Sequence, residues 1–194
     1  MCIRDSSKLS YNNLGDGITF MTESFLEDTE ITGPIASKLF ISSETEDTDL
    51  FLIARLFNEQ QQEVTFQGAL DPKTPLAQGW LRASHRKIDN HLSKPYRPYH
   101  THDKVELLIP KKVYEVDIEI WPTSIVVPKG YRIGLTIKGQ DYVNQSGGGS
   151  TLPNMNKFSG CGPFLHDDPI DRPNDILVKK KHFIFKGAKK QILY

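Results

Sequence analysis

Two groups of histidine and aspartate are the residues of this sequence best suited to metal or acid–base chemistry. His100, His102 and Asp103 form the first group, and residues 166–168 form the second. Residues i and i+2 of an extended segment share a face, so His100 and His102 would chelate one ion with a ligand from the second group. The spacing matches no strict metal motif, and histidine–carboxylate hydrogen bonds that fix loops explain the same residues. We therefore expect no metal and no cofactor.

Serine-nucleophile chemistry would need the pentapeptide G-x-S-x-G on a strand-to-helix turn. The sequence contains no such pentapeptide. Ser84 stands beside His85, but adjacent residues of an extended segment point to opposite sides, so the two side chains do not make a nucleophile–base pair. We therefore expect no catalytic residue in this chain and no activity from the chain alone.

An aromatic and proline-rich run, residues 95–100, is the strongest candidate for a contact surface. Tyr96 and Tyr99 would give a solvent-facing loop an unusual amount of flat apolar surface. Such a patch fits a protein interface, local packing or stacking on a sugar ring. A stand-alone carbohydrate-binding module that uses Tyr96, Tyr99 and Trp80 is therefore the alternative function.

Alternation of apolar and polar residues predicts strands rather than helices. In residues 113–121 one face carries Tyr114, Val116, Ile118 and Ile120, and residues 131–138 repeat the pattern after the turn signal Pro128-Lys129-Gly130. Further strands are predicted at residues 18–21, 35–42, 49–58, 63–66, 79–84 and 179–185. Helix evidence is limited to a short turn that Thr74 would cap. The predicted class is all-β, with a sandwich, a jelly roll or a barrel as the architecture.

Composition excludes several classes of function. Lys plus Arg equals Asp plus Glu at 24 each, so no global field attracts nucleic acid, and the lysines at 179–181 fit an edge strand. The longest apolar run, residues 50–54, is far shorter than the roughly 20 residues of a membrane span. Two distant cysteines and the absence of a signal-like start favour a reducing, cytoplasmic location. We expect neither a nucleic-acid nor a membrane partner.

Two long segments, residues 82–110 and 140–175, are rich in Pro, Gly, Asn, Asp and His. Loops of this length inside a compact domain are usually functional or packed against another body. We expect these loops to contain the interface or cleft-wall residues Trp80, His85, Tyr96, Tyr99, His100, His102, Asp103, Phe164, His166, Asp167 and Asp168.

Four strings between residues 64 and 173 resemble a known family: VTFQGALDPKTPLAQGWLRASHRKID, KPYRPYHTHD, VYEVDIEIWPTSIVVPKGYRIGLTIKGQDY and GCGPFLHDDPIDRP. They are similar to the C-terminal, non-catalytic domain of X-Pro dipeptidyl-peptidases and cocaine-esterase-like (CocE/NonD) serine hydrolases. The resemblance implies a jelly-roll, galactose-binding-like domain with long loops and little helix.

The same resemblance implies that a catalytic α/β-hydrolase domain precedes the jelly roll and supplies the serine, aspartate and histidine of the triad. None of these maps onto a residue here. The implied parent reaction is hydrolysis of a peptide or ester acyl bond, and this chain would reach that substrate only through its partner domain. We expect residues 1–17 to be a non-native or truncated leader and residues 18–194 to be the jelly-roll domain.

Overall fold

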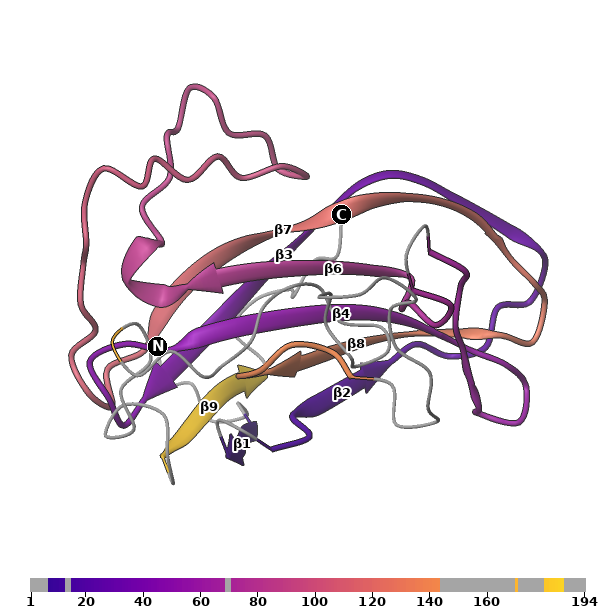
Figure 1. Cartoon of the computed structure of the whole chain (residues 1–194), viewed down its shortest axis with the longest axis horizontal. Coiled ribbons are helices and arrows are strands. Elements are labelled where there is room, and N and C mark those ends of the chain that lie inside the picture. Colours follow the sequence, from indigo (N-terminus) through magenta and orange to yellow (C-terminus); the bar gives the residue numbers. More distant parts are fainter. Residues whose placement is uncertain (1–6, 13–14, 69–70, 144–169, 171–179, 187–194) are drawn as a thin grey trace.

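The computed structural model describes residues 7–12, 15–68, 71–143, 170 and 180–186, and its strands form two antiparallel sheets (Figure 1). The first sheet has the order β1 (Ser7–Asn12), β9 (Lys181–Lys186), β3 (Thr29–Ser43) and β7 (Tyr114–Val127). The second has the order β2 (Ile18–Met21), β8 (Arg132–Lys138) and β4 (Asp49–Phe57), with β5 (Glu63–Val64) and β6 (Ala77–Arg82) both paired to the other edge of β4.

The order of the strands is that of a jelly roll. If the eight longer strands are numbered along the chain and the short β5 is left out, one sheet runs 1-8-3-6 and the other 2-7-4-5. Successive strands thus cross from one sheet to the other, except strands 4 and 5 (β4 and β6), which pair within the second sheet, as in two interlocked Greek keys. The prediction of an all-β jelly-roll sandwich is confirmed, whereas the galactose-binding-like label stays a prediction.

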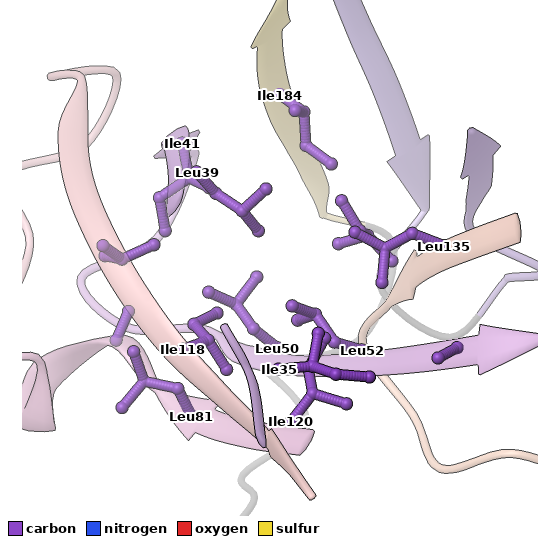
Figure 2. Close-up of a cluster of buried hydrophobic side chains, with 14 of the residues drawn as sticks. Ile35, Leu39, Ile41, Leu50, Leu52, Leu81, Ile118, Ile120, Leu135 and Ile184 are labelled. Atoms are coloured by element: carbon purple, nitrogen blue, oxygen red, sulfur yellow. The ribbon is translucent and has the colours of Figure 1, made fainter. Parts of the chain in front are cut away.

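The core lies between the two sheets, and strand alternation explains which residues reach it. On β7, Val116, Ile118 and Ile120 are buried while Glu115 and Glu119 lie on the other face, as the sequence predicts. Figure 2 shows the core side chains converging from both sheets. Its labelled members are Ile35, Leu39, Ile41, Leu50, Leu52, Leu81, Ile118, Ile120, Leu135 and Ile184.

Strand β4 is buried on both of its faces. Leu50 and Leu52 point into the main core, while Phe51 and Ile53 form a second cluster with Tyr142 on the opposite face. This arrangement explains why the segment reads as a continuous apolar run rather than as an alternating one.

Strands β3 and β7 are longer than predicted. Their pairing is continuous except for a register shift between Gly33 and Ile35, opposite Pro122. A proline cannot donate a ladder hydrogen bond, and it is tolerated in an edge strand or at a bulge. Pro122 therefore does not end β7, although the sequence pattern suggested an end at residue 121.

The edges of the two sheets meet closely where β6 crosses β7. A β-carbon on Gly79 would lie 2.1 Å from the carbonyl oxygen of Glu119, so only glycine permits this approach. Beside it, Trp80 of β6 meets Trp121 of β7 edge to face, with ring centroids 5.0 Å apart. The contact closes one corner of the sandwich.

One strand was missed, and one sequence expectation was wrong. No strand was predicted at residues 7–12, where pairing with β9 supplies the backbone partners of β1 that local sequence did not reveal. Thr74 does not cap a helical turn; its backbone pairs with Phe66 in an isolated bridge, with N–O distances of 2.8 and 2.9 Å. The only helical element among the described residues is the 3-10 turn η1 (Ala83–His85).

No helix in the described part of the chain has the length and apolar character needed to cross a bilayer.

Candidate functional site

The long loop between η1 and β7, residues 86–113, holds five of the seven predicted site residues that the structure describes. It projects beyond the sheets and returns along the outer edge of the molecule to β7 (Figure 1). Two bridges, Ile88 with His100 and Lys94 with Arg97, hold its two arms together. Asp89 accepts backbone hydrogen bonds from His91 and Leu92, which lower the pKa of its carboxyl. The loop is therefore an ordered structure of its own.

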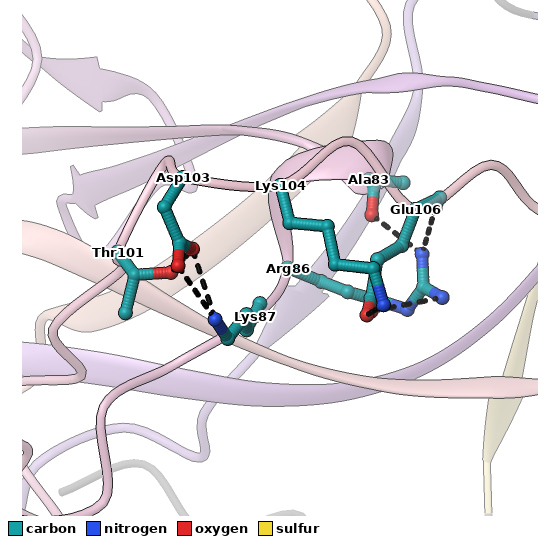
Figure 3. A network of polar contacts seen from close by, with 7 residues as sticks. All are labelled: Ala83, Arg86, Lys87, Thr101, Asp103, Lys104 and Glu106. Carbon is teal, nitrogen blue, oxygen red and sulfur yellow. Dashed lines mark hydrogen bonds and ion pairs between the residues drawn. The ribbon is translucent and has the colours of Figure 1, made fainter.

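Arg86 anchors the base of the loop (Figure 3). Its guanidinium donates hydrogen bonds to the carbonyl oxygens of Ala83, at 3.1 Å, and Glu106. It also lies 3.5 Å from the Glu106 carboxylate and 4.7 Å from the centre of the Tyr114 ring. One side chain thus ties η1, the returning arm of the loop and the start of β7 together.

An ion pair between Lys87 and Asp103 also holds the loop (Figure 3). The Lys87 ammonium lies 2.7 and 3.0 Å from the two carboxylate oxygens, and the Thr101 hydroxyl donates to the same group. The hydrogen bonds from Lys87 and Thr101 lower the pKa of Asp103 to about 2. Asp103 is thus an ionised partner of Lys87 at neutral pH.

Three histidines lie close together near the Lys87–Asp103 ion pair. The Nδ1 atoms of His85 and His102 are 3.3 Å apart, so one ring donates and the other accepts. The ring centroids of His100 and His102 are 6.0 Å apart. Burial lowers the pKa of His100, and its Nε2 atom has no hydrogen-bond partner among the described residues. The structure thus places His85 with the two histidines that the sequence had paired.

Among the described residues, no group of three or more His, Cys, Asp or Glu side chains is arranged to hold a metal ion. His166 and Asp168, which the sequence offered as further ligands to His100 and His102, lie outside these residues. His102 has a left-handed backbone, with φ 51°, so the premise of an extended segment fails there. The Asp103 carboxylate is held by Lys87 instead.

The predicted aromatic surface is present. Tyr96 and Tyr99 are about half exposed, at 47% and 51%. Trp80 lies elsewhere, on β6, partly buried against the cluster of Phe51, Ile53 and Tyr142. The three aromatic residues therefore come from two different elements rather than from one loop.

A cavity of about 280 Å³ separates the loop from the outer face of the first sheet. Lys38 of β3 forms part of its wall and makes ion pairs with Glu115 and Asp117 of β7. The other lining residues are Ala36, Ser37, Ile88, Ser93, Lys94, Pro95 and Pro98. The polar wall and the proline-rich wall thus belong to different elements.

Sequence reasoning missed the row formed by Val105, Leu107 and Ile109. All three side chains are exposed, whereas Leu108 between them is buried. Their period-2 spacing was visible in the sequence, but nothing local indicated which face would meet solvent. No sequence pattern predicted that Arg86 anchors the loop. Its partner Glu106 lies 20 residues further along the chain, and only the fold of the loop brings the two together.

Four predicted site residues, Phe164, His166, Asp167 and Asp168, lie outside the described residues. Their proposed place in an interface or cleft wall stays a prediction.

Comparisons with known proteins agree on one family. The family described as the X-Pro dipeptidyl-peptidase C-terminal non-catalytic domain matches residues 4–192. A Mycobacterium bovis protein named "Putative serine esterase" is 27% identical over 132 residues, which make up 64% of this chain and 19% of that protein. The chain thus spans about a fifth of this curated relative.

Solved structures extend the comparison to the fold. A CocE/NonD family hydrolase from Staphylococcus aureus superposes with a TM-score of 0.81 and 25% identity, over 97% of this chain and 32% of that one. An aminopeptidase from a marine sediment archaeon of the Thaumarchaeota superposes with a TM-score of 0.57 and 16% identity, over 90% of this chain and 24% of that one. The second likeness shows the fold alone.

Proposed function

The chain belongs to the family of X-Pro dipeptidyl-peptidase C-terminal non-catalytic domains, and we propose that it serves as the accessory domain of a serine hydrolase by packing against a catalytic α/β-hydrolase portion. The observation that carries the proposal is the full-length likeness to one third of the Staphylococcus aureus hydrolase. In such an enzyme the jelly roll contributes architecture, and the reacting groups belong to the larger portion.

The reaction we propose for the whole enzyme is hydrolysis of an acyl bond in a peptide or an ester. A serine would attack the carbonyl carbon, a histidine would carry the proton to the leaving group, and backbone donors would stabilise the oxyanion. These groups lie in the catalytic portion in our proposal. This chain therefore lines one side of the substrate cleft and contributes no reacting group.

We assign the loop of residues 86–113, with the adjoining His85, to the contact with the catalytic portion. Its support is physical: Arg86 and the Lys87–Asp103 pair hold the loop in place, and Tyr96 and Tyr99 remain half exposed. Exposed aromatic surface on an ordered loop is typical of an interface. His100 and His102 would lie at the base of the same contact, and Trp80 at the closed corner of the sandwich.

The alternative of a stand-alone carbohydrate-binding module has no support from the family or from the similar structures. Trp80, which that reading grouped with Tyr96 and Tyr99, packs against Trp121 at the β6–β7 corner. The accessory-domain function is therefore the one we develop.

The experiment is an activity assay on the purified chain. We expect no hydrolysis of p-nitrophenyl esters or of X-Pro p-nitroanilides, because the chain has no G-x-S-x-G nucleophile turn. Turnover that co-purifies with the chain and disappears on treatment with a serine-reactive inhibitor would contradict the proposal. The intact parent enzyme, assayed beside the chain, is the positive control.

A further inference from the structure

We propose that residues 104–109 form a docking edge, to which an extended segment of the catalytic portion pairs through its main chain. This inference rests on the proposed function, because that portion is the occupant to which it commits. The docking edge runs along the returning arm of the long loop, just before β7 (Figure 1). Its alternate residues have opposite roles.

The even-numbered residues hold the docking edge onto the domain. The Glu106 N–H donates to the Ser84 carbonyl oxygen at 2.8 Å, and the Leu108 N–H donates to the Glu46 carbonyl oxygen at 2.6 Å. The Arg86 guanidinium binds the Glu106 carbonyl oxygen, and the Leu108 side chain is buried in the core. These contacts fix the segment before any partner arrives, which lowers the entropic cost of binding.

The odd-numbered residues face outward. Val105 and Leu107 make no backbone hydrogen bond within the described part of the chain, whereas the Ile109 N–H donates to the Tyr114 hydroxyl at 2.9 Å. Residues i and i+2 of an extended segment direct their main-chain groups to the same edge. Two successive outward residues with free N–H and C=O groups are what an added strand requires.

The side chains of the same residues supply the apolar part of the contact. Val105, Leu107 and Ile109 are 60%, 54% and 60% exposed. These three aliphatic side chains add no stability to the isolated domain while they face water. A partner that covers them would gain roughly 25 cal/mol of binding free energy per Å² of apolar surface buried. Main-chain pairing and apolar cover thus coincide on one edge.

Charge at the end of the docking edge favours the catalytic portion over a second copy of this chain. Lys111 and Lys112 are exposed, and no carboxylate of the described residues lies within ion-pair distance of either. A parallel self-pairing would bring the two sets of lysines together, whereas a partner strand with carboxylates opposite Lys111 and Lys112 would be attracted in either direction. The Staphylococcus aureus hydrolase, of which this domain covers 32%, has a body of chain large enough to provide that surface.

The test uses the chain and the catalytic portion of its parent enzyme, produced separately and mixed. We expect them to form a complex, and we expect the amides of Val105 and Leu107 to exchange fast with deuterium in the free chain and slowly in the complex. The variant V105S/L107S/I109S should bind at least about tenfold more weakly. Val126→Ser, at an equally exposed valine (60%) on β7, is the matched control and should bind like the wild type.

Leu107→Pro separates main-chain pairing from apolar cover. Proline keeps an apolar side chain but removes an N–H that has no partner in the free domain, so the variant should fold like the wild type and still bind weakly. Circular dichroism and thermal unfolding verify its folding.

The outcomes separate two failures. If no complex forms with the wild-type chain, the proposed function is wrong and the docking edge with it. If a complex forms without protection of Val105 and Leu107, and V105S/L107S/I109S binds normally, only the docking edge is wrong. If these amides become protected in a dimer of the free chain, the occupant is a second copy and the inference is overturned.

Discussion

His182 shows at the residue scale how a single buried side chain makes stability depend on pH. It lies on β9 beside Tyr11, with ring centroids 5.7 Å apart, and neither ring nitrogen has a hydrogen-bond partner among the described residues. Burial lowers its pKa to about 4, although the charges of Glu44 and Asp49 act in the opposite direction. The folded domain therefore holds this ring neutral.

The pH dependence follows from that pKa. The unfolded chain binds a proton near pH 6.5, and the folded chain does so only near pH 4, so the stabilisation is complete above pH 6.5 and is lost as the pH falls toward 4. We expect a loss of about 3 kcal/mol in the free energy of unfolding, measured by urea titration across this range.

His182→Phe should remove this contribution. Because the ring nitrogens make no hydrogen bond in the described residues, the variant should be at least as stable as the wild type at pH 7.5. Equal pH slopes for the two proteins between pH 4 and 6.5 would contradict the prediction. His91→Ala, at an exposed loop position, is the control and should keep the wild-type slope.

Arg86 is the residue on which the order of the long loop depends. Arg86→Ala leaves the Glu106 carbonyl without its guanidinium donor, and we expect a loss of about 1–3 kcal/mol in the free energy of unfolding. Trypsin should also cleave the loop faster, at Lys87 or Lys104. Arg86→Lys should rescue little, since an ammonium lacks the planar fork of the guanidinium.

The matched control for Arg86 is Arg132→Ala. Arg132 also donates to a carbonyl oxygen, that of Thr22, and lies 3.6 Å from a carboxylate, that of the exposed Glu23. Arg132→Ala should lower the free energy of unfolding by less than Arg86→Ala does, and it should leave the rate at which trypsin cleaves the long loop unchanged. Equal cleavage rates in the two variants would show that Arg86 does not order the loop.

The crossing of β6 and β7 is the feature of the elements most sensitive to a small change. Gly79→Ala would place its β-carbon 2.1 Å from a backbone oxygen of β7, and neither strand can move without disturbing the core. We expect a loss of about 3 kcal/mol in the free energy of unfolding, measured by urea titration.

Gly134→Ala on β8 is the comparison for this substitution. Its β-carbon would lie 2.6 Å from Cε2 of the Phe57 ring, a side-chain atom that can shift as the ring tilts. The loss should therefore be smaller than for Gly79→Ala. The reverse order of the two losses would mean that the β6–β7 approach is not the tight contact of the sandwich.

The whole molecule should unfold as one unit, because residues of both sheets share the main core. Both tryptophans of the chain, Trp80 and Trp121, lie at the corner where the sheets meet. Their fluorescence therefore reports on sheet-to-sheet packing, whereas far-UV circular dichroism reports on the strands. We expect the two signals to change at the same urea concentration, and a separation of the midpoints would show that the sheets come apart first.

Local residue patterns were enough to predict the class of the fold and the faces of its strands. Side chains alternate with a period of two because of backbone geometry alone, so the buried positions of β7 were readable without a structure. The turn before β8 was equally local: the Tyr131 N–H binds the Pro128 carbonyl oxygen, and Gly130 has the positive φ of 85° that favours glycine. The strings of the family resemblance extended this reading to the accessory function.

The arrangement of the long loop and of the strand edges depends on contacts between segments that are distant in the sequence. Strand β1 is recognisable only through its pairing with β9, and Arg86 becomes an anchor only when residue 106 returns beside it. The left-handed backbone of His102 removed the extended geometry on which the predicted chelate rested, and Lys87 forms an ion pair with Asp103. The exposed row of Val105, Leu107 and Ile109 has the same alternation as a buried strand. What differs is the neighbouring surface, which pairing between distant segments sets and local sequence does not encode.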